Sequence, residues 1–279
     1  MIRGLGQHLA ARKEQISLFH QHLRAQYADR VLYWEARGLS RMDSSDTLCI
    51  ICDGMDQSKW DLPRSPMTKG KDFSTLQKVR MHVAACIAHG HCAMFVVSTP
   101  DTKKDGNASV EILAHMLSRL KAKGLPLSRM HVVLQHDNTC REFKNATGLR
   151  WGASQVAGKN VASMTHRYLR CGHTHEDIDQ IFSRLARHLR KARDMQTPQD
   201  VCKVIEDFLQ TAHFPFEKDR CVVQMDSVRD WFLEDLFSCV FIPISALRSD
   251  VACTAVYGQT IGVHNILQIP LKTLIPTRD

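Results

Sequence analysis

Two short strand-like runs that each end at an aspartate constrain the fold of this chain more than any other feature. Residues 48–52 precede Asp53, and residues 131–136 precede Asp137. A strand without polar alternation is buried on both faces, as in the centre of a sheet covered by helices. An aspartate at the end of such a strand lies where the crevice of an open α/β sheet forms. Each aspartate taken alone is better explained as a turn residue.

Hydrophobic periodicity and turn residues predict an α/β protein with a mixed sheet flanked by helices. Helices are expected over residues 5–37, 110–120, 175–193 and 198–211, with a short helix or loop over 139–160. Strands are expected over 47–53, 80–88, 92–98, 131–136 and 165–171, and later over 239–244, 251–257 and 264–269. We therefore expect an N-terminal helical segment (1–42), a central domain (43–195) and a small acidic C-terminal α+β region (196–279).

Charge is distributed unevenly along the chain. The net charge is +8, but residues 196–279 carry 7 basic and 11 acidic residues, so the excess of positive charge lies in residues 1–195. A basic region of this kind favours a polyanion such as DNA as partner, although a solvated basic surface explains the same counts. We expect no membrane association, because no apolar run reaches about 18 residues.

The N-terminus lacks an apolar signal core, and the ten cysteines show no disulfide framework. Both features favour the nucleus or the cytoplasm over secretion. The chain begins directly with an amphipathic helical pattern, which suits a piece of a longer protein with additional domains. A homo-oligomer is a further possible partner arrangement.

The third informative segment is the start of the helix expected from residue 175. Thr174 and Asp177 have the spacing of a capping box, and Glu176 suits the first turn of a helix, so both acids have a structural explanation. Asp179 borders the apolar stripe of this helix and has no such explanation. An acid at that position needs a compensating partner, such as a metal ion. We rank Asp179 first as a third metal ligand, then Glu176, then Asp177.

Three motifs together resemble a known superfamily. They are Asp53-Gly-Met-Asp-Gln-Ser-Lys-Trp-Asp-Leu-Pro-Arg64, Asp137-Asn-Thr-Cys-Arg-Glu-Phe-Lys-Asn145 and Gly172-His-Thr-His-Glu-Asp-Ile-Asp-Gln-Ile-Phe182. In this order, over about residues 45–195, they resemble the ribonuclease H-like superfamily, and in particular a transposon-derived eukaryotic domain family with DDE-transposase-like features. The third acid is Asp here, where transposases usually have Glu.

The resemblance implies a sheet of three antiparallel strands plus parallel strands, and a catalytic trio of Asp53, Asp137 and Asp179. It also implies two-metal phosphoryl transfer on DNA with Mg²⁺ or Mn²⁺, which prefer oxygen ligands. Asp56 is a reserve ligand beside Asp53. The alternative is a catalytically inactive module that keeps the fold and binds nucleic acid or protein.

Basic side chains near these acids are candidates for contact with nucleic acid, and each is also explained as ordinary surface charge. The candidates are Lys59, Arg64, Lys144, Arg184, Arg187, Arg190 and Lys191. Cys171, His173 and His175 suggest zinc, but a fourth ligand at zinc-like spacing is missing.

Overall fold

A computed structural model describes residues 2–56, 61–65, 78–137, 139–168, 176–192, 194–211, 214, 216–231, 254–257 and 266–269. For residues 2–10, 61, 254–257 and 266–269 only the backbone is described. The predicted strands over 239–244 lie outside these residues. None of the helices in the described part is both long and apolar enough to cross a membrane.

Eight of the described strands form one mixed sheet in the order β10-β9-β7-β6-β1-β4-β5-β8. At its centre, β1 (Thr47–Gly54) pairs with β6 (His131–His136) in parallel and with β4 (His82–Ala88) antiparallel. β5 (Cys92–Ser98) forms the expected hairpin with β4, and β7 (Ser163–Tyr168) runs parallel to β6. Three antiparallel strands (β1, β4, β5) therefore adjoin parallel strands, which confirms the predicted α/β mixed sheet.

The C-terminal part of the chain extends both edges of this sheet. β8 (Asp219–Met225) pairs in parallel with β5, although no strand was predicted there. At the other edge, β9 (Thr254–Tyr257) pairs with β7, and β10 (Ile266–Ile269) pairs with β9. A separate two-stranded ribbon joins β2 (Asp61–Leu62) and β3 (Val79–Arg80). The predicted boundary at residue 195 concerns whether residues 43–195 and 196–279 fold independently, and it stays a prediction.

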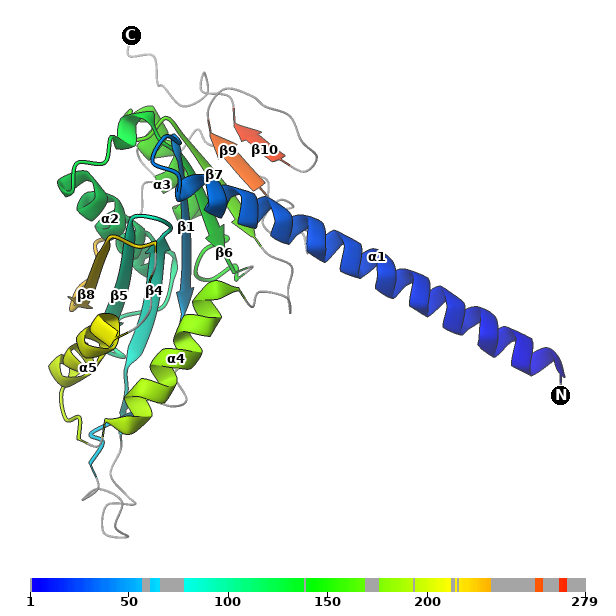
Figure 1. Cartoon of the computed structure of the whole chain (residues 1–279), viewed down its shortest axis with the longest axis horizontal. Coiled ribbons are helices and arrows are strands. Elements are labelled where there is room, and N and C mark those ends of the chain that lie inside the picture. The colour runs from blue at the N-terminus through cyan, green and yellow to red at the C-terminus, as the bar shows by residue number, and fades with distance from the viewer. Residues whose placement is uncertain are drawn as a thin grey trace.

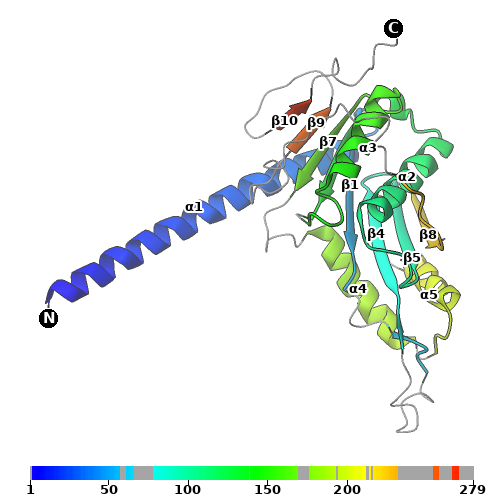
Figure 2. The same cartoon turned by 180° about the vertical axis from the view of Figure 1, so that it is seen from behind.

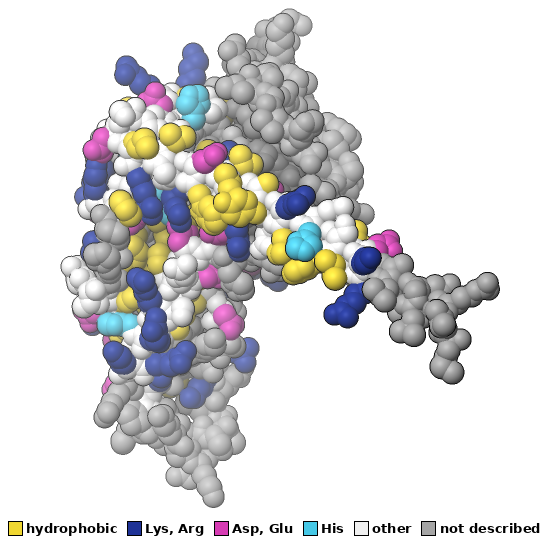
Figure 3. Space-filling model, turned by 45° about the vertical axis from the view of Figure 1, so that its right-hand side comes forward, with side chains coloured by type: hydrophobic (Ala, Val, Ile, Leu, Met, Phe, Trp, Pro, Cys, Tyr) yellow, Lys and Arg dark blue, Asp and Glu magenta, His cyan; other side chains and the backbone are white. Residues whose placement is uncertain are grey.

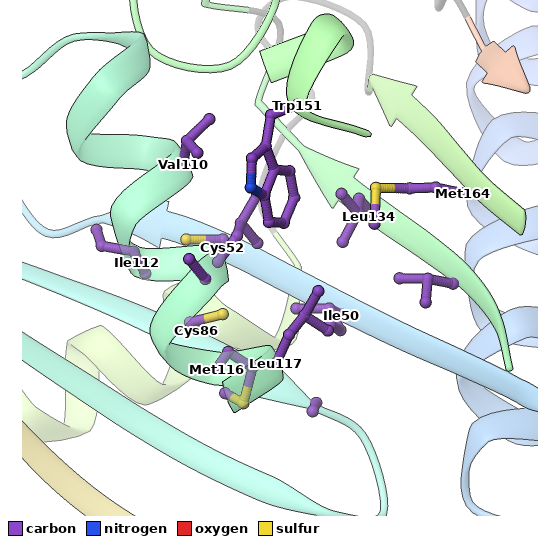
Figure 4. Close-up of a cluster of buried hydrophobic side chains, with 14 of the residues drawn as sticks. Ile50, Cys52, Cys86, Val110, Ile112, Met116, Leu117, Leu134, Trp151 and Met164 are labelled. Atoms are coloured by element: carbon purple, nitrogen blue, oxygen red, sulfur yellow. The ribbon is translucent and has the colours of Figure 1, made fainter. Parts of the chain in front are cut away.

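Helices cover both faces of the sheet (Figures 1 and 2). One face packs against α2 (Gly106–Ala122) and α3 (Ala146–Ala157), and a short 3-10 turn, η4 (Leu127–Arg129), follows α2. Its core includes Ile50, Leu134 and Trp151, which are at most 1% exposed (Figure 4). The other face packs against α4 (Asp177–Lys191), α5 (Pro198–Thr211) and the last turns of α1 (Ile2–Ser40). The central strands are thus buried on both faces, as their apolar runs predicted.

The helix α1 projects far from the rest of the molecule (Figure 1). Near its end, Tyr33 and Ala36 are buried in the core under α4. Farther out, Phe19 and Tyr27 are exposed by 59% and 62% of their surface. The predicted N-terminal helix is therefore confirmed, and only its final turns pack on the sheet.

Candidate functional site

Asp53 and Asp137 lie side by side at the carboxyl ends of two neighbouring central strands. β1 and β6 are parallel and in a register that pairs Cys52 with His136, so the next residue on each strand is one of the two aspartates. Neighbouring strands are about 4.8 Å apart, which keeps the two side chains close.

The two aspartates also lie on the same face of the sheet. Side chains alternate along a strand. Ile50 and Cys52 belong to the core under α2 and α3, whereas Cys49 and Ile51 belong to the core under α4. Cys52 faces α2 and α3, so the side chain of the next residue, Asp53, lies on the α4 side. Val133 packs under α4 and lies four residues before Asp137, so the side chain of Asp137 lies on the α4 side as well.

The helix that supplies the third acid begins beside these strand ends (Figure 1). The N-cap of α4 is Glu176, and Glu176 and Asp179 form a capping box in which the Glu176 N–H donates to Asp179 Oδ2 over 3.0 Å. The predicted capping box of Thr174 and Asp177 is therefore wrong, because the helix begins two residues later. Asp179 consequently does have a structural explanation.

The two acids before Asp179 point toward α1. Glu176 is 7% exposed and pairs with Arg30 over 3.0 Å, and it accepts a hydrogen bond from Trp34 Nε1. Asp177 accepts hydrogen bonds from the Tyr33 hydroxyl over 2.6 Å and from Arg37 over 3.0 Å. These contacts tie α1 to the start of α4. They also engage Glu176 and Asp177 elsewhere, which leaves Asp179 as the acid of α4 that acts on Asp53.

Neighbouring acids affect the titration of Asp53. Its pKa is raised to about 7, chiefly by burial and in addition by the negative charges of Asp179, Asp137 and Glu142, whereas a hydrogen bond from the Gly54 N–H lowers it. A charge has this effect only at short range in a partly buried setting. The three predicted carboxylates therefore belong to one electrostatic cluster, which also includes Glu142.

Two neighbours of this cluster were not predicted as site residues. A Cβ atom built on Gly54 would meet Lys104 Nζ at 3.6 Å and Glu142 Oε2 at 4.0 Å. Lys104 therefore supplies positive charge beside the acids, from the loop that precedes α2. Thr139 Oγ1 donates to Asp137 Oδ2 over 3.0 Å and orients that carboxylate. Loop residues of this kind carry no periodic signal that marks them in a sequence.

The predicted basic contacts separate into groups. Arg184, Arg187, Arg190 and Lys191 are exposed along α4. Lys and Arg side chains gather over the lower half of the face that α4 and α5 cover (Figure 3).

The remaining predicted residues lie in different settings. Arg64 donates to the Leu189 and Arg190 carbonyls at the end of α4. Lys144 is 2% exposed and lies over the Tyr168 ring. Asp56 is exposed next to β1. Lys59 and the zinc candidates Cys171, His173 and His175 lie outside the described residues.

Carboxylate oxygens suit Mg²⁺ or Mn²⁺, and mutual repulsion within the cluster is a reason to bind a cation. Within the part of the chain that the structure describes, however, no three His, Cys, Asp or Glu side chains are close enough to hold one metal ion. The acids therefore match a divalent cation by their chemistry, and coordination by all three needs a closer approach of their side chains.

Comparison with known proteins places the chain in a family. A family model described as a domain of unknown function (DUF7869) matches residues 71–240, which is more than half of the chain. The chain belongs to the DUF7869 family. No curated protein matches it. The DUF7869 match includes Asp137, Glu142 and Asp179, and it begins after Asp53 and after the whole of α1.

Proposed function

We propose that this protein is a metal-dependent phosphoryl-transfer domain that acts on DNA, of the ribonuclease H-like, transposase-derived kind. The observation that carries the proposal is the position of Asp53 and Asp137 after paired residues of two parallel strands, with Asp179 near enough for its charge to raise the pKa of Asp53. These residues come from two strand ends and a helix start, far apart in the sequence. Acids delivered in this way suit divalent cations that act on a phosphate.

The topology of the sheet supports the same proposal. The resemblance implied three antiparallel strands followed by parallel ones, with acids after the first and fourth of these strands. The strands β1, β4 and β5 are antiparallel neighbours, and β6 and β7 run parallel to β1. Asp53 lies in the first strand and Asp137 directly after the fourth. This agreement concerns geometry that no single motif specifies.

In the proposed mechanism Asp53, Asp137 and Asp179 would hold the cations. Bound Mg²⁺ or Mn²⁺ would activate a water or a 3′-hydroxyl and stabilise the leaving oxygen. The chain orients its acids beforehand. The Gly54 N–H fixes Asp53 over 2.7 Å, the Thr139 hydroxyl fixes Asp137, and the Glu176 N–H fixes Asp179. Lys104 limits the repulsion among them when no cation is bound.

The exposed basic residues of α4 fit a backbone contact. Arg184, Arg187, Arg190 and Lys191 follow Asp179 on the same helix and lead away from the acids. Phosphate contacts of this kind position a nucleic acid without reading its sequence. We therefore propose that α4 directs the DNA strand toward the acid cluster.

A second candidate is an inactive module of the same fold that binds nucleic acid or protein. One observation favours it: Asp179 already serves the capping box of α4, so its presence needs no catalytic explanation. Under this alternative the acids would bind no cation cooperatively, but the basic face of α4 would still bind DNA with a graded dependence on salt.

Titration calorimetry with Mn²⁺ separates the two candidates. The wild type is compared with Asp53→Asn/Asp137→Asn, and Asp101→Asn/Asp226→Asn is the matched control because it removes two acids outside the cluster. The proposal expects Mn²⁺ binding that the cluster variant loses and the control keeps, together with Mn²⁺-dependent DNA cleavage. Binding that is equally weak in all three proteins, with DNA affinity retained, would replace it by the inactive module.

A further inference from the structure

A cavity of about 460 Å³ lies far from the acid cluster. Its walls come from α2, the turn around η4, the α3 region and the segment 229–231. Leu127 and Ser128 line it just before β6 begins, whereas Asp137 follows the end of β6. Six residues of strand separate the two by about 20 Å. The cavity is therefore distinct from the site of the proposed function.

The shape and lining of this cavity are those of a small-molecule site. Such sites measure roughly 300–1,000 Å³ and are mostly apolar, with a few polar groups that fix the ligand. Leu117, Leu125 and Val161 supply aliphatic walls, and Trp151 and Trp231 supply aromatic ones, with their rings 6.5 Å apart and nearly perpendicular. At this distance and angle the two rings contact each other edge to face and form one aromatic wall.

The charges around the cavity have one sign. Lys121, Lys159 and Arg229 line it, and no acid does so in the described part of the chain. Arg229 is already paired with Glu111 over 2.9 Å. Lys121 and Lys159 take part in no ion pair among the described residues. They therefore present positive charge at the rim of an apolar cavity.

We propose that this cavity binds a small amphiphilic anion, with an apolar body against Leu117, Val161 and Trp231 and an acidic head group near Lys121 and Lys159. A carboxylate, phosphate or sulfonate is the class of head group that suits these cations.

The test uses two fluorescent probes with the same ring system. 8-Anilinonaphthalene-1-sulfonate carries the anion, and N-phenyl-1-naphthylamine lacks it. The full chain should bind both saturably at one site. Ser118→Trp fills the cavity from its exposed edge and should abolish both, whereas Ser183→Trp on the exposed face of α4 should change neither. Circular dichroism and thermal melting confirm that each variant is folded.

Charge selectivity is measured with variants at exposed positions, which leave the core intact. Lys121→Gln/Lys159→Gln should weaken sulfonate binding by roughly 3- to 10-fold without affecting the neutral probe, because each exposed ion pair contributes at most about 1 kcal/mol. Lys103→Gln/Lys203→Gln has the same net charge and should bind like wild type. Unsaturable binding, equal binding in the two tryptophan variants, or equal loss of both probes in the lysine variant would overturn the proposal.

Discussion

The raised pKa of Asp53 makes a prediction about stability that does not depend on any assay of function. In the folded protein burial, and then the charges of Asp179, Asp137 and Glu142, raise this pKa from 3.8 to about 7. Between these two values the folded chain holds a proton that the unfolded chain has lost. Stability attributable to Asp53 therefore falls as the pH rises from about 4 to about 7, and it is constant above that.

The size of the effect follows from the pKa difference. About three pH units correspond to about 4 kcal/mol, which is an upper bound because the neighbouring acids titrate together with Asp53. Asp53→Asn removes the charge and keeps an oxygen that can accept the Gly54 N–H. The variant should thus exceed wild type in free energy of unfolding by as much as about 4 kcal/mol at pH 8. That is a rise in Tm of about 10 °C for a chain of this size.

Urea denaturation at pH 4.5 and pH 8 measures this difference. Asp101→Asn, an exposed acid outside the cluster, should change stability equally little at both pH values. Saturating Mn²⁺ should stabilise wild type at pH 8 and leave Asp53→Asn unchanged, since a ligand stabilises only the state that binds it. The reasoning is refuted if Asp53→Asn is no more stable than wild type at pH 8, or if its gain is the same at pH 4.5.

Two further predictions concern the framework of the site. Gly90→Ala should destabilise the fold by more than Gly124→Ala: both glycines have positive φ (81° and 86°), but a Cβ at Gly90 would lie 2.8 Å from the Ser40 carbonyl oxygen, and one at Gly124 would meet nothing within 4 Å. Chemical denaturation measures both variants, and equal losses would contradict the steric argument. Tyr33→Phe should cost about 1–3 kcal/mol, because its hydroxyl contacts Asp177 over 2.6 Å and His89 over 2.8 Å in a buried position. Tyr27→Phe on the exposed part of α1 should cost almost nothing, and a similar loss there would contradict the role of the α1 contacts.

The central sheet was predictable because its strands carry strong local signals. The apolar runs before Asp53 and Asp137 leave few alternatives to buried strands, and the turn at Gly90 marks the hairpin. The strand β8 was missed because Asp219 and Arg220 at its start interrupt the apolar pattern. Its pairing with β5 depends on a partner more than 100 residues earlier in the chain.

The start of α4 could not be chosen from the sequence, because the segment holds two capping boxes. Thr174 with Asp177 and Glu176 with Asp179 have the same spacing. Tertiary contacts select the second, since Asp177 bonds to Tyr33 and Arg37 of α1. The same limit applies to Lys104, whose approach to Gly54 depends on how the loop before α2 folds over the end of β1.

The anchoring of α1 has a hydrodynamic consequence. Arg30 pairs with Glu176 of the body, and the part of α1 that precedes Arg30 spans about 40 Å and projects outward (Figure 1). That is comparable with the diameter of a compact body of this size. A single copy should therefore diffuse and elute from a sizing column like a compact protein heavier than 31.7 kDa. The predicted homo-oligomer should therefore be tested by the mass from light scattering, because the elution volume also depends on the shape of the protein.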